Sequence, residues 1–267
     1  ALAGDRLDDQ VERLAQHALR GEVWDKALAY GRQAGDKAHA RSAYREAVGG
    51  YEQALVALEH LSDNQAATEQ AIDIRLGLRP ALNALGEAPG RILDHLRRAE
   101  ALAQTLGDPL RLGRVYADMS DMCWLVDELA PALDYGQRAL ALAVTLGHVG
   151  LQARVQMVLG RVYYDVGDYA RAIESLERNV ATLQGKLLSE RFGTNGSVAV
   201  ASRAHLSLCH AERGAFTEGL AIAVEGQRLA ETVNNPFRLI EACYGVSVVY
   251  VRQGEMPRAL PVLERAL

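Results

Sequence analysis

Arginines and aromatic residues in the middle of the chain are the side chains best suited to molecular recognition. Guanidinium groups bind carboxylates and phosphates through paired N–H donors, and aromatic rings offer flat apolar contact area. Together these residue types predict a binding site for a peptide or a small anion. The candidate binding residues are Arg114, Asp121, Trp124, Arg154, Arg161, Tyr164, His205 and Tyr244.

The same residues also fit an ordinary exposed helix face. Asp118, Asp121 and Asp165 lie close by in the sequence and would neutralise the arginines. Exposed charges on helix surfaces pair in this way without any ligand. The sequence leaves both interpretations open.

Motifs for catalysis or metal binding are missing from the sequence. It contains no GxGxxG, GxxxxGK[ST], HExxH or GxSxG pattern, so we expect no enzyme activity and no cofactor. His205 and Cys209 are four residues apart on one predicted helix, but Cys209 falls on the packing side. A zinc site needs three or four ligands, so no metal site is predicted.

Composition narrows the class of protein. The 267 residues include 29 Lys and Arg against 34 Asp and Glu, and this net charge of −5 disfavours nucleic acid as a partner. Three cysteines without CxxC spacing favour a reducing compartment, so we expect a cytoplasmic protein. No apolar stretch approaches the ~20 residues of a membrane span. The chain begins with Ala1 and lacks a helix stop signal at its end, which suggests a piece of a longer polypeptide.

A small residue followed twelve positions later by Ala or Gly is the strongest internal repeat. The pairs are Ser120 and Ala132, Gly160 and Ala172, Ser207 and Gly219, and Ser247 and Ala259. Their first members are 40, 47 and 40 residues apart, a period that suits a pair of amphipathic helices. Between them lie turn signals such as Gly167-Asp168, where glycine can adopt a positive φ.

These patterns predict an all-α fold, a right-handed α-α superhelical solenoid of about thirteen helices. Small residues at the repeated positions would let paired helices approach closely where they cross. We expect one continuous repeat domain over residues 1–267. Its predicted units are 22–60, 64–106, 108–146, 148–185, 195–233 and 235–267, preceded by one helix at 5–20.

One unit resembles the tetratricopeptide repeat (TPR) family almost throughout. The matching residues are Leu159, Gly160, Tyr163, Gly167, Asp168, Tyr169, Ala172, Ile173 and Leu176. The resemblance implies a non-catalytic module that binds a protein or peptide through a concave groove lined by the first helix of each pair.

A narrower resemblance covers most of the chain and is carried by residues 18–27, 40–47 and 190–193. These segments are similar to the C-terminal region of bacterial signalling proteins that join a class III adenylate or guanylate cyclase domain to an AAA/STAND-type ATPase and then to TPR units. This implies a regulatory role in which the partner could be another domain of the same polypeptide. It also keeps open a small-molecule sensor that controls an upstream ATPase or cyclase.

The unit around residues 186–200 is seven residues longer than its neighbours. Two interpretations remain open for this insertion. Leu187, Leu188 and Phe192 could fold back over the groove as a lid, or the segment could be a longer helix and a plain turn.

Overall fold

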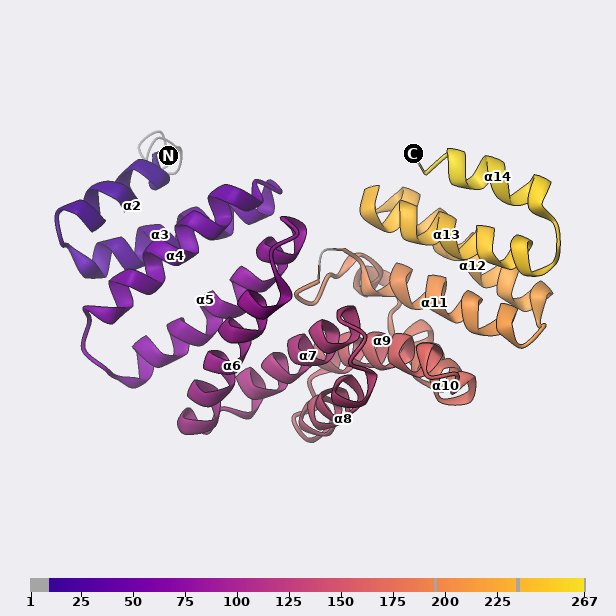
Figure 1. Cartoon of the computed structure of the whole chain (residues 1–267), viewed down its shortest axis with the longest axis horizontal. Helices are drawn as coiled ribbons and strands as arrows, with labels where there is room; N and C mark the ends of the chain where they lie inside the picture. The colour runs from indigo at the N-terminus through magenta and orange to yellow at the C-terminus, as the bar shows by residue number, and fades with distance from the viewer. Residues whose placement is uncertain (1–9, 195, 234–235, 267) are drawn as a thin grey trace. The chain divides into compact units, whose positions relative to one another are not determined.

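The protein is built of helices, as a computed structural model shows for residues 10–194, 196–233 and 236–266 (Figure 1). These residues form thirteen α-helices and one 3-10 helix and contain no strand. The predicted all-α class is therefore confirmed. The helices are α2 (Val11–Arg20), α3 (Trp24–Ala40), α4 (Tyr44–Glu59), α5 (Gln65–Ala84), α6 (Pro89–Leu106), α7 (Pro109–Leu125), α8 (Leu129–Thr145), α9 (Val149–Asp165), α10 (Tyr169–Thr182), η1 (Gly185–Ser189), α11 (Val198–Glu212), α12 (Phe216–Thr232), α13 (Pro236–Arg252) and α14 (Met256–Glu264).

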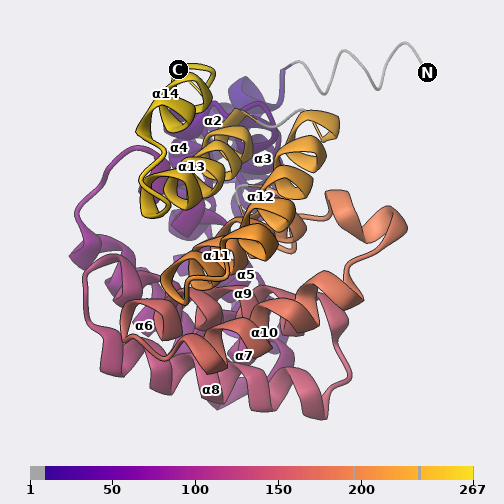
Figure 2. The same ribbon diagram turned by 90° about the vertical axis from the view of Figure 1, so that its right-hand side faces the viewer.

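Each helix packs mainly on its neighbours in sequence, so that consecutive helices form hairpins (Figures 1 and 2). The chain divides into two compact units, which we call unit 1 (Ala1–Asp118) and unit 2 (Met119–Leu267). Within unit 2, α11 also contacts α9 and α13, the first helices of the hairpins on either side. The first helices therefore lie side by side and form one face.

A single residue with positive φ marks the turn inside every hairpin. Gly86, Gly167, Gly214 and Gly254 have φ between 69° and 79°, as the predicted turn signals require. Ser42 and Asp127 hold the equivalent positions at φ of 60° and 62° without being glycine. Left-handed backbone is unfavourable for residues with a Cβ, so these two turns carry a small conformational cost.

Small residues lie where paired helices cross, as the twelve-residue offset predicts. The Ser120 hydroxyl donates to the carbonyl of Ala132 at 2.7 Å. A Cβ added to Gly160 would lie 2.6 Å from Leu176, which is too close for any larger side chain.

The insertion does not form the longer helix and plain turn that were one of the two alternatives, while the lid over the groove stays a prediction. Helix α10 ends at Thr182, and the 3-10 helix η1 and a loop follow it. Leu187, Leu188 and Phe192 pack against the apolar core of unit 2 instead of extending a helix. The apolar side chains decide this outcome, because burying them against the core is more favourable than exposing them on a longer helix.

Some predicted features fall partly outside the described residues. The first predicted helix is seen from Val11 onward, and residues 5–9 lie outside the described part. Asn195 in the insertion, Asn234 and Asn235 before α13, and Leu267 also lie outside the described part.

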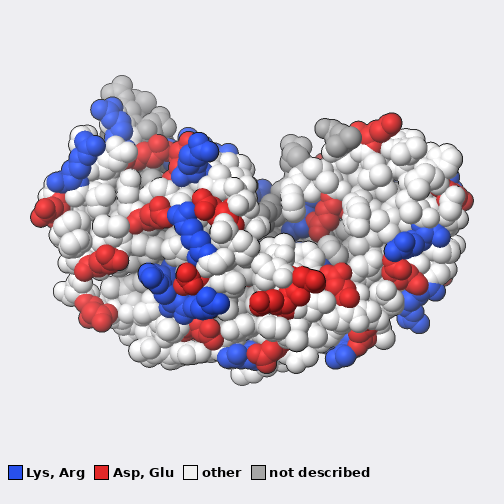
Figure 3. Space-filling model, viewed as in Figure 1, with Lys and Arg blue, Asp and Glu red and all other residues white. Residues whose placement is uncertain are grey.

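In the described residues, no helix is both long and apolar enough to cross a membrane. Acidic and basic side chains are interspersed on the face shown in Figure 3.

Candidate functional site

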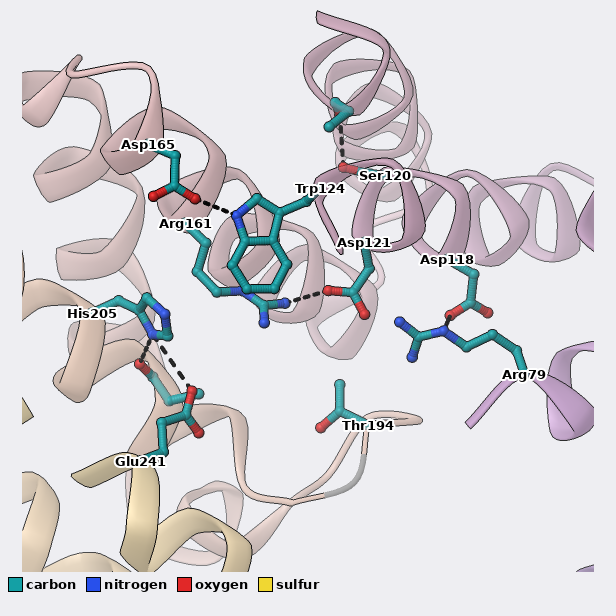
Figure 4. A network of polar contacts seen from close by, with 12 residues as sticks. Arg79, Asp118, Ser120, Asp121, Trp124, Arg161, Asp165, Thr194, His205 and Glu241 are labelled. Carbon is teal, nitrogen blue, oxygen red and sulfur yellow. Dashed lines mark hydrogen bonds and ion pairs between the residues drawn. The ribbon is translucent and has the colours of Figure 1, made fainter. Parts of the chain in front are cut away.

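Helices α7, α9, α11 and α13 supply the polar side chains of one surface of unit 2. We call this surface the first-helix face and define it by Asp121, Trp124, Arg154, Arg161, Asp165, His205, Arg238 and Glu241. Each of these helices packs its apolar stripe against the core. The polar side of the helix, opposite that stripe, therefore points to this face. Figure 4 shows the central residues of the face.

Arg161 lies at the centre of the first-helix face. Its Nη2 donates to the Asp121 carboxylate at 2.5 Å, and both side chains are nearly buried, with exposed fractions of 12% and 13%. The guanidinium carbon lies 4.3 Å from the ring centroid of Trp124. The indole N–H of Trp124 in turn donates to Asp165 at 2.5 Å (Figure 4). An ion pair, a cation–π contact and an indole hydrogen bond thus join α7 to α9.

Burial makes the charge of Arg161 unusually costly. Loss of solvation lowers its pKa to about 10, and the positive charge of Arg154 adds to this effect, while the Glu241 and Asp165 carboxylates oppose it. The guanidinium remains protonated at neutral pH. Its Nε is buried and has no hydrogen-bond partner among the described residues. Arg161 therefore holds an unused donor below the surface of the face.

His205 and Glu241 form a second polar pair beside Arg161. The Nδ1 atom of His205 lies 3.0 Å from the carbonyl oxygen of Ala201 and 3.6 Å from a Glu241 carboxylate oxygen. Burial, with the charges of Arg161 and Arg238, lowers the pKa of His205, although Glu241 opposes the shift. The imidazole is thus neutral at pH 7. Burial alone would raise the pKa of Glu241, but the neighbouring Arg238, His205 and Arg161 hold it below the ordinary value.

The insertion is tied to the first-helix face through Arg238. This side chain is 4% exposed and donates to Glu241, and at 3.3 Å to the Thr194 hydroxyl and to the carbonyl of Gly196. A Cβ at Gly196 would lie 2.5 Å from the Arg238 side chain. Only glycine therefore lets the loop approach this closely.

Tyr164 and Tyr244 border the face on α9 and α13. The Tyr164 hydroxyl donates to Glu212 at 3.1 Å, and Arg252 donates twice to the same carboxylate oxygen. Burial and the Glu212 charge raise the pKa of Tyr164. Tyr244 is 53% exposed and offers an aromatic surface to solvent.

The structure brings seven of the eight predicted binding residues into unit 2. Arg114 belongs to unit 1, where its side chain is exposed. Asp118, expected to neutralise the candidate arginines, forms a buried ion pair with Arg79 of unit 1, at 3.5 Å. Of the two interpretations that the sequence left open for Arg161, the pairing with Asp121 is the one seen, because Asp121 accepts from one of its donors. The reason is that the two residues sit on adjacent first helices.

Arg238 and Glu212 are site residues that the sequence did not single out. Arg238 lies three residues before Glu241 on one helix, a spacing that allows an ion pair. The sequence therefore contained a signal for it. Glu212 ends α11, and its pairing with Tyr164 and Arg252 spans 48 and 40 residues of sequence. No local pattern indicates such distant contacts.

Metal binding finds no support in the described residues, where no group of three or more His, Cys, Asp or Glu side chains could hold an ion. Cys209 is fully buried, and burial raises its pKa to about 12. A thiol in that state is a poor metal ligand, because the thiolate is the coordinating form.

Comparison with known proteins identifies a tetratricopeptide repeat within the unit that the sequence suggested. The tetratricopeptide repeat family model matches residues 157–187, which contain most of α9, all of α10 and the start of η1. The chain has the tetratricopeptide-repeat fold. Helical hairpins lie on both sides of the matched segment. No curated protein is similar enough in sequence to count as a match.

Solved structures share this TPR fold at low sequence identity. A Rap protein complexed with competence and sporulation factor has a TM-score of 0.70 and 16% identity over 90% of this chain. The chain spans 65% of the length of that Rap protein. The Rap conjugation gene regulator of plasmid pLS20, in complex with the Phr* peptide, has a TM-score of 0.67 and 14% identity, covering 90% of this chain and 73% of that one.

A signalling protein also shares the fold. The STAND protein PH0952 from Pyrococcus horikoshii, which has a tetratricopeptide repeat sensor, has a TM-score of 0.62 and 16% identity. The match covers 98% of this chain and 41% of PH0952. At these identities the likeness concerns the fold alone.

Proposed function

We propose that the chain is a non-catalytic interaction module that binds a protein or peptide through the first-helix face of unit 2. The single observation that carries this proposal is the buried charge of Arg161 beside Trp124. Burying a guanidinium at a surface lowers stability unless its donors are fully used, and one donor of Arg161 is unused. A partner carboxylate that adds a counter-charge beside this guanidinium would offset part of the cost of burying it.

The chemistry of the face suits a peptide with an acidic group. Arg161 can bind a carboxylate with the donors that Asp121 leaves free, and Trp124 and Tyr244 offer aromatic contact area. Tryptophan, tyrosine and arginine are the residue types that contribute most to protein interfaces. Two solved structures with the same fold contain a bound factor or peptide, which agrees with this use of the fold.

A regulatory role is the finer part of the proposal. The fold likeness to a STAND protein with a TPR sensor supports a module whose binding event controls another domain. A small molecule at the same face is the alternative, and a thermal-shift screen with metabolites separates the two. A ligand that binds only the folded state raises the melting temperature, by an amount that grows with the logarithm of its concentration relative to its dissociation constant.

The test is a peptide selection followed by calorimetry. Peptides are selected from a random display library against the parent chain, and their affinities are measured for the parent and for Trp124→Ala and Arg161→Met. We expect each variant to bind at least about tenfold more weakly, since hot-spot residues contribute ~1.4 kcal/mol or more.

Arg178→Met is the matched control. Arg178 lies on the second helix α10, is 59% exposed and pairs with Glu174, so its loss should leave the affinity unchanged. If the selected peptides bind all variants and the control equally, the first-helix face is not the binding surface. Metabolite stabilisation without peptide binding would favour the sensor instead.

A further inference from the structure

Basic side chains also gather in unit 1, where α6 packs against α5. Arg91, His95 and Arg98 follow one another at spacings of four and three residues, so they lie on one face of α6. Arg75 of α5 is close to them, because its charge interacts with those of Arg98 and His95. We call these four residues the α6 basic cluster.

Two nitrogen atoms of the α6 basic cluster are buried without a hydrogen-bond partner among the described residues. They are Nε of Arg75 and Nδ1 of His95. Arg75 uses Nη1 to donate to the carbonyl of Ala71 on its own helix, at 3.0 Å. A buried donor or acceptor without a partner lowers stability, and most buried polar groups in native structures are hydrogen-bonded. An oxygen ligand would satisfy both when the neutral His95 ring carries its hydrogen on Nδ1.

Only some of the arginines in the cluster are paired with carboxylates. Arg91 is held by Glu52 at 2.5 Å and by Glu87 at 3.0 Å. Arg75 and Arg98, in contrast, make no ion pair within 4 Å in the described part of the chain. Burial and the charge of Arg98 lower the pKa of Arg75, although Glu59 opposes the shift. The positive form of Arg75 is therefore destabilised by its surroundings.

His95, the imidazole of the cluster, is likewise affected by burial and by the neighbouring positive charges. Burial and the charges of Arg75, Arg91 and Arg98 lower the pKa of His95, against the single opposing effect of Glu52. A group of cations that repel one another and retain unused donors is complementary to an anion. A phosphate oxygen can accept from a guanidinium through strong, charge-assisted hydrogen bonds.

We propose that the α6 basic cluster is a binding site for a phosphate group. Oxygens of the phosphate accept from the guanidinium groups of Arg75 and Arg98, while the neutral ring of His95 donates through its Nδ1–H. Arg91, fixed by two carboxylates, supplies additional positive potential. The site lies in unit 1 and does not depend on the proposed peptide-binding face of unit 2.

The test is a titration of the whole chain with inorganic phosphate, followed by NMR at constant ionic strength. Signals of the Arg75 Nε–H group and the His95 ring should shift and reach saturation. Arg75→Gln and Arg98→Gln should each weaken binding about tenfold, which corresponds to ~1.4 kcal/mol. A parallel titration with phosphoserine shows whether a free phosphate or a phosphate ester binds more tightly.

Arg97→Gln provides the control on the same helix. Arg97 is 61% exposed and pairs with Asp94, so its replacement should leave the phosphate affinity unchanged. Circular dichroism confirms that each variant is folded, and the exposed Arg98 can be replaced without disturbing the core. Shifts that grow linearly without saturation, or an Arg98→Gln variant that binds like the parent, would overturn the proposal.

Discussion

The ion pair between Arg161 and Asp121 is expected to lower the stability of the chain, and a double-mutant cycle measures this directly. Burial lowers the pKa of Arg161 from 12.5 to about 10. Each pKa unit corresponds to ~1.4 kcal/mol, so the charged form is disfavoured by about 3 kcal/mol relative to water. Replacing the pair by neutral side chains of similar size should remove this cost.

The cycle uses Arg161→Met, Asp121→Asn and the double variant, unfolded by urea and followed by circular dichroism. Each single variant should be less stable by ~2–4 kcal/mol, because it leaves one buried charge without the counter-charge it has in the parent. The double variant should be as stable as the parent or up to ~3 kcal/mol more stable. Arg178→Met, from an exposed pair, should change stability by less than ~0.5 kcal/mol.

A double variant that loses about the sum of the two single losses would refute this reasoning. Additive losses would mean that the two side chains have no coupling energy and that each stabilises the fold through other contacts, so Arg161 would then be a structural residue. A stable double variant that no longer binds the selected peptides would instead separate function from stability at this site.

Three other predictions concern protonation and the backbone. The folded pKa of His205 lies below its ordinary 6.5, so the folded state binds protons less readily and stability should fall as pH drops below 6.5. His205→Gln should reduce this loss in urea titrations at pH 7 and pH 5. Gly160→Ala should lower the free energy of unfolding by ~1–3 kcal/mol through its contact with Leu176, whereas Gly49→Ala, with open space around its Cβ, should raise it by ~0.5–1 kcal/mol. Asp127→Gly at φ 62° should raise the melting temperature by a few degrees, and a lower value would contradict the assigned turn cost.

The hairpin architecture follows from local signals that the sequence carries. The turn at Gly167 and the close crossing at Gly160 each depend on residues within one repeat, where glycine or another small residue is physically required. Such requirements recur at a fixed spacing, so the helices and their pairing could be predicted. The candidate residues Trp124 and Arg161 could also be placed on first helices, because a helical stripe opposite the core is set by periodicity alone.

The sequence suggested Asp121 and Asp165 as counter-charges for the arginines, but it could not decide between paired and open side chains. Whether Arg161 is open or paired depends on the distance between α7 and α9, which the sequence does not encode locally. The form of the insertion could not be decided from the sequence, because the burial of Phe192 depends on the core that surrounding helices create. Side-chain partners in a repeat protein are decided between hairpins, while helix patterns are decided within them.

The most direct test of the peptide-binding face uses Trp124 as a reporter. The chain has two tryptophans, so Trp24→Phe leaves Trp124, beside Arg161, as the sole tryptophan fluorophore. A peptide selected against the parent is titrated into this variant. The proposal predicts a saturable change in emission with the same dissociation constant that calorimetry gives. Binding by calorimetry with no change in Trp124 emission would contradict it.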